Sequence, residues 1–226
     1  MKYAKNNRRR YRRGGKRKGA KVRKGRRTNL RRYGTTYSRA INGPMANRQI
    51  VKLRYSEDVN LTASVSLNSY DFRANSIYDP NLTGTGHQPL GHDQWSNFYD
   101  HYCVLGAKIT VKMFHTNNTN TDSVFYSLAL QDTSNTMTSQ SMIREQPRTS
   151  WTMVSPPSAG QSQKTLTKKF SAKKFFGAKS VITWDKLSAT FGSNPTEDAL
   201  FRIFYQNATS VNNVGVGVNV IIGIIS

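Results

Sequence analysis

Apolar and polar residues alternate along much of the chain after residue 48, and this two-residue period is typical of β-strands with one buried face. Val51, Leu53 and Tyr55 share one face of such a strand, while Lys52 and Arg54 share the other. The pattern predicts strands near 49–55, 59–67, 104–114, 123–131, 164–170, 200–206 and 214–225, with a weaker one at 181–184. No long segment has the 3.6-residue period of a helix, and short helices are expected only within 93–102 and 139–146.

The connections between these predicted strands are long, at about 68–103, 131–163 and 171–199. Loops of this length are uncommon in a compact domain unless they have a function, and we expect them to form contacts between subunits. About eight antiparallel strands joined by such loops predict an all-β fold of the sandwich type. The single jelly roll is the leading candidate.

Charge divides the chain into two very different parts. Residues 1–39 hold eighteen of the 34 Lys and Arg residues and no Asp or Glu, so all twelve acidic residues come later. A segment of this kind repels itself and has too few apolar residues to form a core. We therefore expect a disordered basic arm over 1–39, a hinge over 40–48 and one folded domain over 49–226.

The basic arm needs a polyanionic partner, and nucleic acid is the predicted one. Arg and Lys neutralise phosphates and release counterions without reading the base sequence, and the tyrosines of the arm are suited to stacking on unpaired bases. A nuclear-localisation signal is the expected second use of the same residues, and a plain solvated tail is the alternative. The predicted phosphate contacts are Arg8, Arg9, Arg10, Arg12, Arg13, Lys16, Arg17, Lys18, Lys21, Arg23, Lys24, Arg26, Arg27, Arg31, Arg32, Arg48, Lys52 and Arg54.

Residues that could carry catalysis or hold a metal form no recognisable site in the sequence. His87 and His92 have a loosely ligand-like spacing, but one cysteine cannot supply a Cys-rich zinc pattern. Cys103 lies two residues after His101, so a strand would place both on one face; a buried structural cysteine is a better interpretation than a Cys–His nucleophile. We therefore expect no catalytic residue, no metal site, no cofactor and no enzymatic activity.

The cysteine content and the apolar runs of the sequence indicate the compartment and the relation to a membrane. A single cysteine excludes an intrachain disulfide, which fits a reducing compartment. The N-terminus is basic, but no apolar segment of the kind found in secretory signals follows it. The most apolar run, 214–225, is too short to span a bilayer and predicts a buried strand. No membrane insertion is expected.

Two blocks of sequence point to a known family. Residues 73–114 contain, in order, Tyr78-Asp79-Pro80, Gly86-His87-Gln88-Pro89, Asp93-Gln94, Tyr99 and Tyr102 before a Lys108-Ile109-x-Val111 strand. Residues 191–207 read FGSNPTEDALFRIFYQN. With an Arg-rich arm before Leu53-Arg54-Tyr55, these blocks resemble the capsid proteins of circoviruses and related small circular single-stranded DNA viruses. The resemblance covers most of the chain from Arg48 onward.

This resemblance implies a single jelly roll whose strands, lettered B to I, are the eight predicted strands in chain order. It implies a T=1 icosahedral shell of about sixty copies, with the loops outside and the arm inside around a circular single-stranded DNA genome. The implied locations are the virion and, during assembly, the host nucleus, with an import receptor as a further partner. Aromatic residues of the loops suit contacts between copies, with core packing as an equal alternative; they are Trp95, Phe98, Tyr99, Trp151 and Trp184.

Three other functions stay open at this point. Nothing in the arm distinguishes DNA from RNA, so a jelly-roll capsid protein of a small RNA virus or satellite virus is the alternative in the same class. A cellular nucleic-acid-binding protein with a basic tail is the alternative in a different class. An enzyme such as a nuclease comes third, because it needs a metal-binding carboxylate cluster that the sequence does not offer.

Overall fold

The computed structural model describes residues 45–116, 121–132, 136–160, 163–178, 180–208 and 212–225. All of them belong to one of the two units into which the chain divides, Ile41–Ser226. The basic arm predicted over 1–39, and with it fifteen of the eighteen predicted phosphate contacts, lies outside the described residues.

The described residues form nine strands, and this confirms the all-β prediction. Every pairing among the strands is antiparallel. The strands are β1 (Ile50–Ala63), β2 (Asn68–Arg73), β3 (His101–His115), β4 (Val124–Gln131), β5 (Thr149–Val154), β6 (Gln163–Ser171), β7 (Ser188–Thr190), β8 (Leu200–Asn207) and β9 (Asn212–Ile225). The helices are α1 (His92–Ser96), α2 (Gln140–Glu145) and α3 (Ala172–Phe175), with 3-10 turns at Pro157–Ala159 and Asp185–Leu187.

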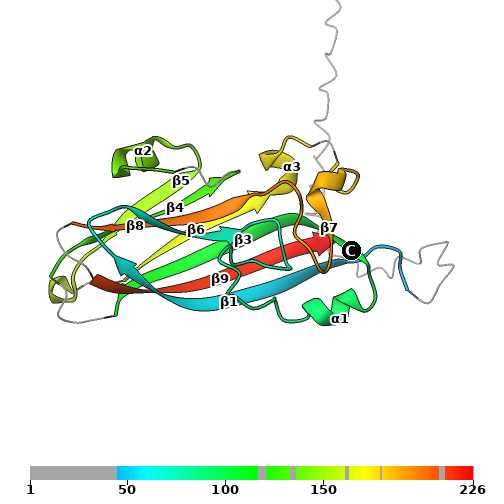
Figure 1. Ribbon diagram of the computed structural model, residues 1–226, viewed down its shortest axis with the longest axis horizontal. Coiled ribbons are helices and arrows are strands. Elements are labelled where there is room, and N and C mark those ends of the chain that lie inside the picture. Colours follow the sequence, from blue (N-terminus) through cyan, green and yellow to red (C-terminus); the bar gives the residue numbers. More distant parts are fainter. Residues whose placement is uncertain are drawn as a thin grey trace, which may run out of the picture. The chain divides into compact units, whose positions relative to one another are not determined.

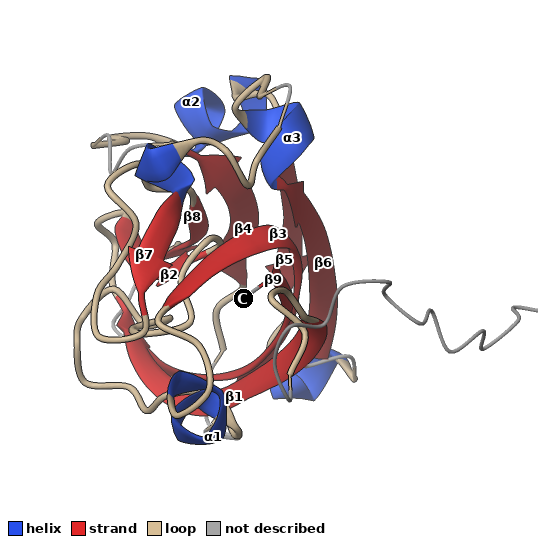
Figure 2. Ribbon diagram, turned by 90° about the vertical axis from the view of Figure 1, so that its right-hand side faces the viewer, coloured by secondary structure: helices blue, strands red, loops and turns tan. Residues whose placement is uncertain are grey.

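These strands form two sheets that face each other as a sandwich (Figures 1 and 2). The first sheet has the order β1-β9-β3-β6, and β7 pairs with the beginning of β3. The second sheet has the order β2-β8-β4-β5. Along the chain, the eight long strands cross from one sheet to the other at every step except from β4 to β5, which are neighbours in the second sheet, and this connectivity is that of a jelly roll.

The core lies between the two sheets. β9, in the middle of the first sheet between β1 and β3, contributes a row of buried side chains at Val214, Val216, Val218, Val220 and Ile222. The predicted apolar face of this strand is therefore confirmed over the residues whose side chains are described. Burial of such a row on the inner face is the main stabilising contribution that this strand can make.

A second, smaller core lies on the outer face of the second sheet. Phe125 and Ala129 of β4 and Phe204 of β8 pack there against Ile143 of α2. Ser139 caps α2 by accepting a hydrogen bond from the backbone N–H of Met142. The helix predicted within 139–146 is thus confirmed, and it covers one part of this sheet.

The strand predicted over 59–67 is wrong as a separate element, because its first residues are the second half of β1. One continuous register with β9 runs from Ile50 to Ala63. The polar residues Ser56, Glu57 and Asp58 interrupt the apolar alternation in the sequence, yet they do not break the strand. Ser56 and Asp58 are exposed on its outer face, while Glu57 lies on the inner side and accepts a hydrogen bond from Tyr55.

The strand β2 lies within 68–103, where the sequence predicted a loop. Its alternation is hidden because one of its buried residues is charged. Asp71 stands opposite Arg202 of β8, and the Arg202 Nε–H donates to both carboxylate oxygens at 3.1 Å. Burial raises the pKa of the Asp71 carboxyl, although the hydrogen bond and charge of Arg202 act in the opposite direction. This buried ion pair joins β2 to the centre of the second sheet.

Two further predictions of strands need correction. The strand predicted over 164–170 was expected to be the fifth in chain order, but it is β6, which pairs with β3 and is the sixth of the eight long strands. The fifth position, lettered F, belongs to β5, which lies within 131–163, where the sequence predicted a loop. Residues 181–184 form no strand: Val181 is buried in the main core and Trp184 packs on Phe176.

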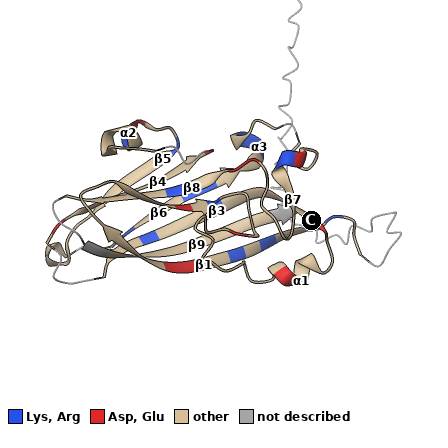
Figure 3. Ribbon diagram, in the orientation of Figure 1, with Lys and Arg blue, Asp and Glu red and all other residues tan. Residues whose placement is uncertain are grey.

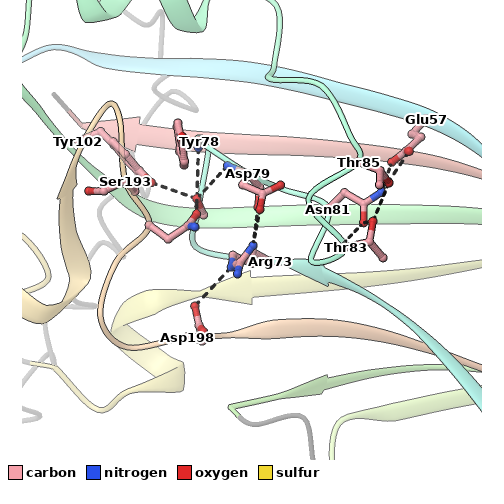
Figure 4. A network of polar contacts seen from close by, with 12 residues as sticks. Glu57, Arg73, Tyr78, Asp79, Asn81, Thr83, Thr85, Tyr102, Ser193 and Asp198 are labelled. Atoms are coloured by element: carbon pink, nitrogen blue, oxygen red, sulfur yellow. Dashed lines mark hydrogen bonds and ion pairs between the residues drawn. The ribbon is translucent and has the colours of Figure 1, made fainter.

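The connection between β2 and α1 is long, and polar contacts hold it in place (Figure 4). The Arg73 guanidinium pairs with the Asp79 carboxylate at 2.9 Å. The Asn81 side chain donates to both oxygens of the Glu57 carboxylate, at 3.1 and 3.0 Å. The Ser76 hydroxyl of the connection lies 3.1 Å from the Tyr102 hydroxyl of β3. Several residues of the sequence block 73–114 therefore fix this loop to both sheets.

Candidate nucleic-acid interface

The outer face of the first sheet gathers basic side chains from three strands. In β1 the residues that alternate with the buried Leu53 and Tyr55 point outward, so Lys52 and Arg54 are exposed on this face. Figure 3 shows two basic bands on β1 next to the end at which the strand begins. This outcome agrees with the sequence pattern, which put both residues on the polar side of the strand.

Strand register places further cations beside these two. Arg54 of β1 is opposite Ile221 of β9, Ile221 is opposite Lys108 of β3, and Lys108 is opposite Lys169 of β6. One row across all four strands therefore carries three cations. Lys112 lies on the same face of β3, two outward positions farther along. We call Lys52, Arg54, Lys108, Lys112 and Lys169 the basic sheet face.

Glycines make a hollow in the middle of the basic sheet face. Gly223 of β9 lies between Lys52 and Gly106 in the strand register, so two adjacent positions have no side chain. The hollow has a volume of about 240 Å³, and Lys52, Lys108 and Lys169 are among its lining residues. A Cβ atom on Gly106 would lie 3.0 Å from the Phe170 carbonyl oxygen, which explains why this position lacks one.

Within the described part of the domain, carboxylates do not neutralise the cations of the basic sheet face. All five side chains are exposed, and none takes part in an ion pair with the residues that the structure describes. Asp58 is the acidic residue on this face of β1, and Gly217 separates it from Lys112 in the strand register. Unpaired, exposed cations around a hollow are suited to contacts with phosphate groups.

Sequence reasoning found only part of this surface. Three of the predicted phosphate contacts lie in the described range. Arg48 is exposed and precedes β1, and Lys52 and Arg54 are in β1. Lys108, Lys112 and Lys169 were missing from the predicted contacts. Their alternation with apolar residues already placed them on outer faces, but only the order β1-β9-β3-β6 brings them next to Arg54.

The five aromatic residues predicted to contact other copies differ in exposure. Phe98 is 61% exposed and Trp151 is 49% exposed, so both side chains are available to a partner. Trp95, Tyr99 and Trp184 are partly buried and pack against the main core. The Tyr99 hydroxyl also donates to the carbonyl oxygen of Ala46 at 3.0 Å. Contacts between copies stay a prediction for all five.

The histidines considered as ligands have other partners. The His87 ring stacks on Tyr55 with centroids 4.6 Å apart. His92 is buried, and its Nε2 lies 3.0 Å from the carbonyl oxygen of Phe191. Among the described residues, no three His, Cys, Asp or Glu side chains come together as they would around a metal ion.

Cys103 has the surroundings of a structural cysteine. Its side chain is buried, and its thiol is 3.6 Å from the carbonyl oxygen of Val181. Burial raises the pKa of the Cys103 thiol to about 11. Reactive cysteines have the opposite property, a lowered pKa and partial exposure. His101, the neighbour considered as its base, is exposed.

No helix in the described ranges is long and apolar enough to cross a bilayer.

No protein-family model and no curated protein matches the sequence. The chain is similar to solved structures of the BFDV capsid protein, one decameric and one a 60-mer. The decameric one has 14% identity and a TM-score of 0.44 over 78% of this chain and 99% of that chain. The 60-mer has 12% identity and a TM-score of 0.43 over 80% and 95%. The Mud crab tombus-like virus structure has 10% identity and a TM-score of 0.43 over 81% and 90%.

Proposed function

We propose that this chain is a viral capsid protein. Its jelly-roll domain builds the shell by self-association, and its basic N-terminal arm packages the genome. The observation that carries the proposal is the combination of two features. One is an acid-free segment with eighteen cations, and the other is a jelly roll whose outer sheet face holds five more cations without carboxylate partners among the described residues. A shell protein needs both parts, because it must contact its own copies and a polyanion.

Charge supports the packaging role. Cations bind a nucleic acid of any sequence by releasing its counterions, so the arm needs no fixed shape to hold a genome. If about sixty copies each turn their eighteen arm cations inward, the shell neutralises roughly a thousand phosphates. Lys52 and Arg54 follow the arm in the sequence and belong to the basic sheet face, so the domain extends the phosphate-binding surface.

The genome in this proposal is circular single-stranded DNA, and the shell is a T=1 icosahedron. The support for both is the resemblance of 73–114 and 191–207 to capsid proteins of circoviruses and related viruses. The same resemblance makes import into the host nucleus the second use of the arm, through its Arg- and Lys-rich stretches. The protein is then located in the virion and, during assembly, in the nucleus.

Contacts between copies in this proposal use exposed apolar side chains. Trp151 and Met153 lie on β5, the edge strand of the second sheet, and are 49% and 38% exposed. Phe98, after α1, is 61% exposed. Exposed aromatic and Met side chains are enriched where proteins contact one another. These positions are the first to substitute when the contacts of the shell are mapped.

The genome type can be tested by assembling the full chain with an equimolar mixture of circular single-stranded DNA and single-stranded RNA of the same length. The particles are purified and treated with both nucleases to remove outside material, and the protected nucleic acid is extracted. Protected DNA in clear excess supports the single-stranded DNA proposal. Protected RNA in excess favours the capsid protein of an RNA virus instead.

The packaging role of the arm can be tested with a variant that lacks residues 2–39. The proposal predicts that this variant protects little nucleic acid under conditions in which the full chain protects much. Wild-type protection by the shortened chain would contradict the proposed role of the arm.

A further inference from the structure

A cavity of the described domain lies at the junction of β6 and α3, on the free edge of the first sheet. Its volume is about 520 Å³, within the range of small-ligand sites. Leu130 of β4, Phe170 of β6 and Phe175 of α3 supply apolar lining. The Phe170 and Phe175 rings meet edge to face with centroids 5.6 Å apart. The cavity therefore has an aromatic wall against which a flat group can lie.

Cations surround this aromatic wall. Arg148, Lys168 and Lys174 line the cavity, and each comes from a different element or connection. The Arg148 guanidinium lies over the Phe175 ring, 4.9 Å from its centroid. Arg148 also adopts a φ of 61°, a left-handed conformation that is uncommon for a residue other than glycine. The fold thus holds this guanidinium at the aromatic wall.

These three cations have no carboxylate partner within the described ranges. Lys168 is half-buried, and burial lowers the pKa of its ammonium group. Two acidic residues, Asp132 and Glu197, line an adjoining hollow, and Glu197 is paired with Lys186 at 2.9 Å. A ligand that enters the cavity therefore meets positive charge and apolar rings together.

The cavity is continuous with the basic sheet face. Lys169 and Phe170 line both the cavity and the hollow around Gly106 and Gly223. Lys168 and Lys169 are neighbours on the edge strand β6, so their side chains leave opposite faces of the sheet. Cations therefore run without interruption from the outer face, around the edge strand and into the cavity.

We propose that this cavity takes one nucleotide of a single-stranded nucleic acid, with its base against Phe170 and Phe175 and its phosphate among Arg148, Lys168 and Lys174. Stacking on aromatic side chains together with a basic groove along the backbone is the general mode of single-strand binding without sequence preference. The neighbouring nucleotides then follow Lys169 onto the basic sheet face. This inference rests on the proposed packaging function and assigns the folded domain a part in it.

The test is photo-crosslinking of the full chain to a single-stranded oligonucleotide of about twelve nucleotides that carries 5-iodouracil, at about 0.3 M salt to weaken the arm contacts. Mass spectrometry then locates the adducts. We expect adducts on Phe170 or Phe175, with a yield that Lys174→Gln lowers roughly tenfold. The matched control is Lys173→Gln, at the neighbouring exposed lysine of α3 that does not line the cavity; it should leave the yield unchanged.

Three results would overturn the inference or its basis in distinguishable ways. If the oligonucleotide binds but forms adducts only outside 170–176, the cavity is excluded as the binding site, and the proposed packaging function is unaffected. If a polyglutamate of equal charge suppresses the cavity adducts as well as unlabelled oligonucleotide does, the cavity is an acidic-peptide site, because base stacking then adds nothing to the affinity. Absence of any binding by the full chain contradicts the packaging function itself.

Discussion

Lys108 on β3 and Lys169 on β6 occupy directly opposed positions of one antiparallel ladder, and both side chains are exposed on the same face of the sheet. Opposed Cβ atoms in such a ladder are about 4.5–5.5 Å apart, so like charges there destabilise the sheet. The domain keeps this repulsion within the basic sheet face, between β3 and the edge strand β6. A bound phosphate between the two ammonium groups would relieve it.

This repulsion predicts that Lys169→Gln makes the free protein more stable while it weakens nucleic-acid binding. The expected gain in the free energy of unfolding is about 0.2–1 kcal/mol, measured by urea denaturation. The salt dependence of binding to single-stranded DNA, as the slope of log K against log salt, should become shallower by about one. Lys186→Gln is the control, because Lys186 is paired with Glu197 and should give no such gain. An unchanged slope for Lys169→Gln would exclude Lys169 as a phosphate contact.

The buried ion pair between Asp71 and Arg202 predicts a large loss of stability for Asp71→Ala. The Asp71 and Arg202 side chains are 10% and 5% exposed, so removal of the carboxylate leaves a cation buried without its charge partner. The expected cost is about 3–5 kcal/mol in the free energy of unfolding. The double variant Asp71→Leu/Arg202→Met should recover most of this loss, because it removes both charges. A loss below about 1 kcal/mol for Asp71→Ala would show that water replaces the carboxylate.

The close approach of β3 to β6 predicts that Gly106→Ala destabilises the domain. The added Cβ atom would lie 3.0 Å from the backbone oxygen of Phe170, and the backbone of an edge strand would have to shift. We expect a loss of about 1–3 kcal/mol in urea denaturation. Gly192→Ala is the matched control, because an added Cβ atom there meets nothing within 4 Å. Equal stability of the two variants would contradict this assignment of Gly106.

The buried thiol of Cys103 predicts slow reaction with a thiol reagent. Burial raises its pKa to about 11, so at pH 8 very little reactive thiolate is present. The native protein should leave its single cysteine unmodified over the minutes in which the urea-unfolded protein reacts completely. Rapid, complete modification of the native protein at pH 8 would show an accessible thiolate and would reopen the nucleophile interpretation.

The sequence was sufficient for the fold class because most strands keep a regular alternation. β9 is the clearest case, since its apolar side chains from Val214 to Ile222 all enter the core. Alternation fails where a position that faces the core side of a strand is polar. The Asp71 carboxylate of β2 accepts a hydrogen bond from Arg202, which is distant in the sequence. The Glu57 carboxylate of β1 accepts hydrogen bonds from Tyr55 and Asn81, and the sequence pattern does not reveal these contacts. The sequence pattern therefore missed β2 and divided β1.

The candidate site could be predicted only one strand at a time. Lys52 and Arg54 were identified because they follow the basic arm directly, whereas Lys169 lies more than a hundred residues later in the chain. Its place beside Lys108 depends on the pairing of β6 with β3, and the sequence pattern gave β6 the wrong position in the strand order. The cavity at α3 likewise needs Arg148 and Phe175 to meet across two connections that were predicted as loops.

The central claim is that the domain assembles into a shell and the arm holds nucleic acid within it. The most direct measurement is negative-stain electron microscopy of the purified full chain, with the ratio of absorbance at 260 and 280 nm on the same fraction. The account predicts uniform round particles with a high ratio. A small species with a low ratio, unchanged across salt and pH and after addition of single-stranded DNA, would contradict self-assembly and favour a cellular protein with a basic tail.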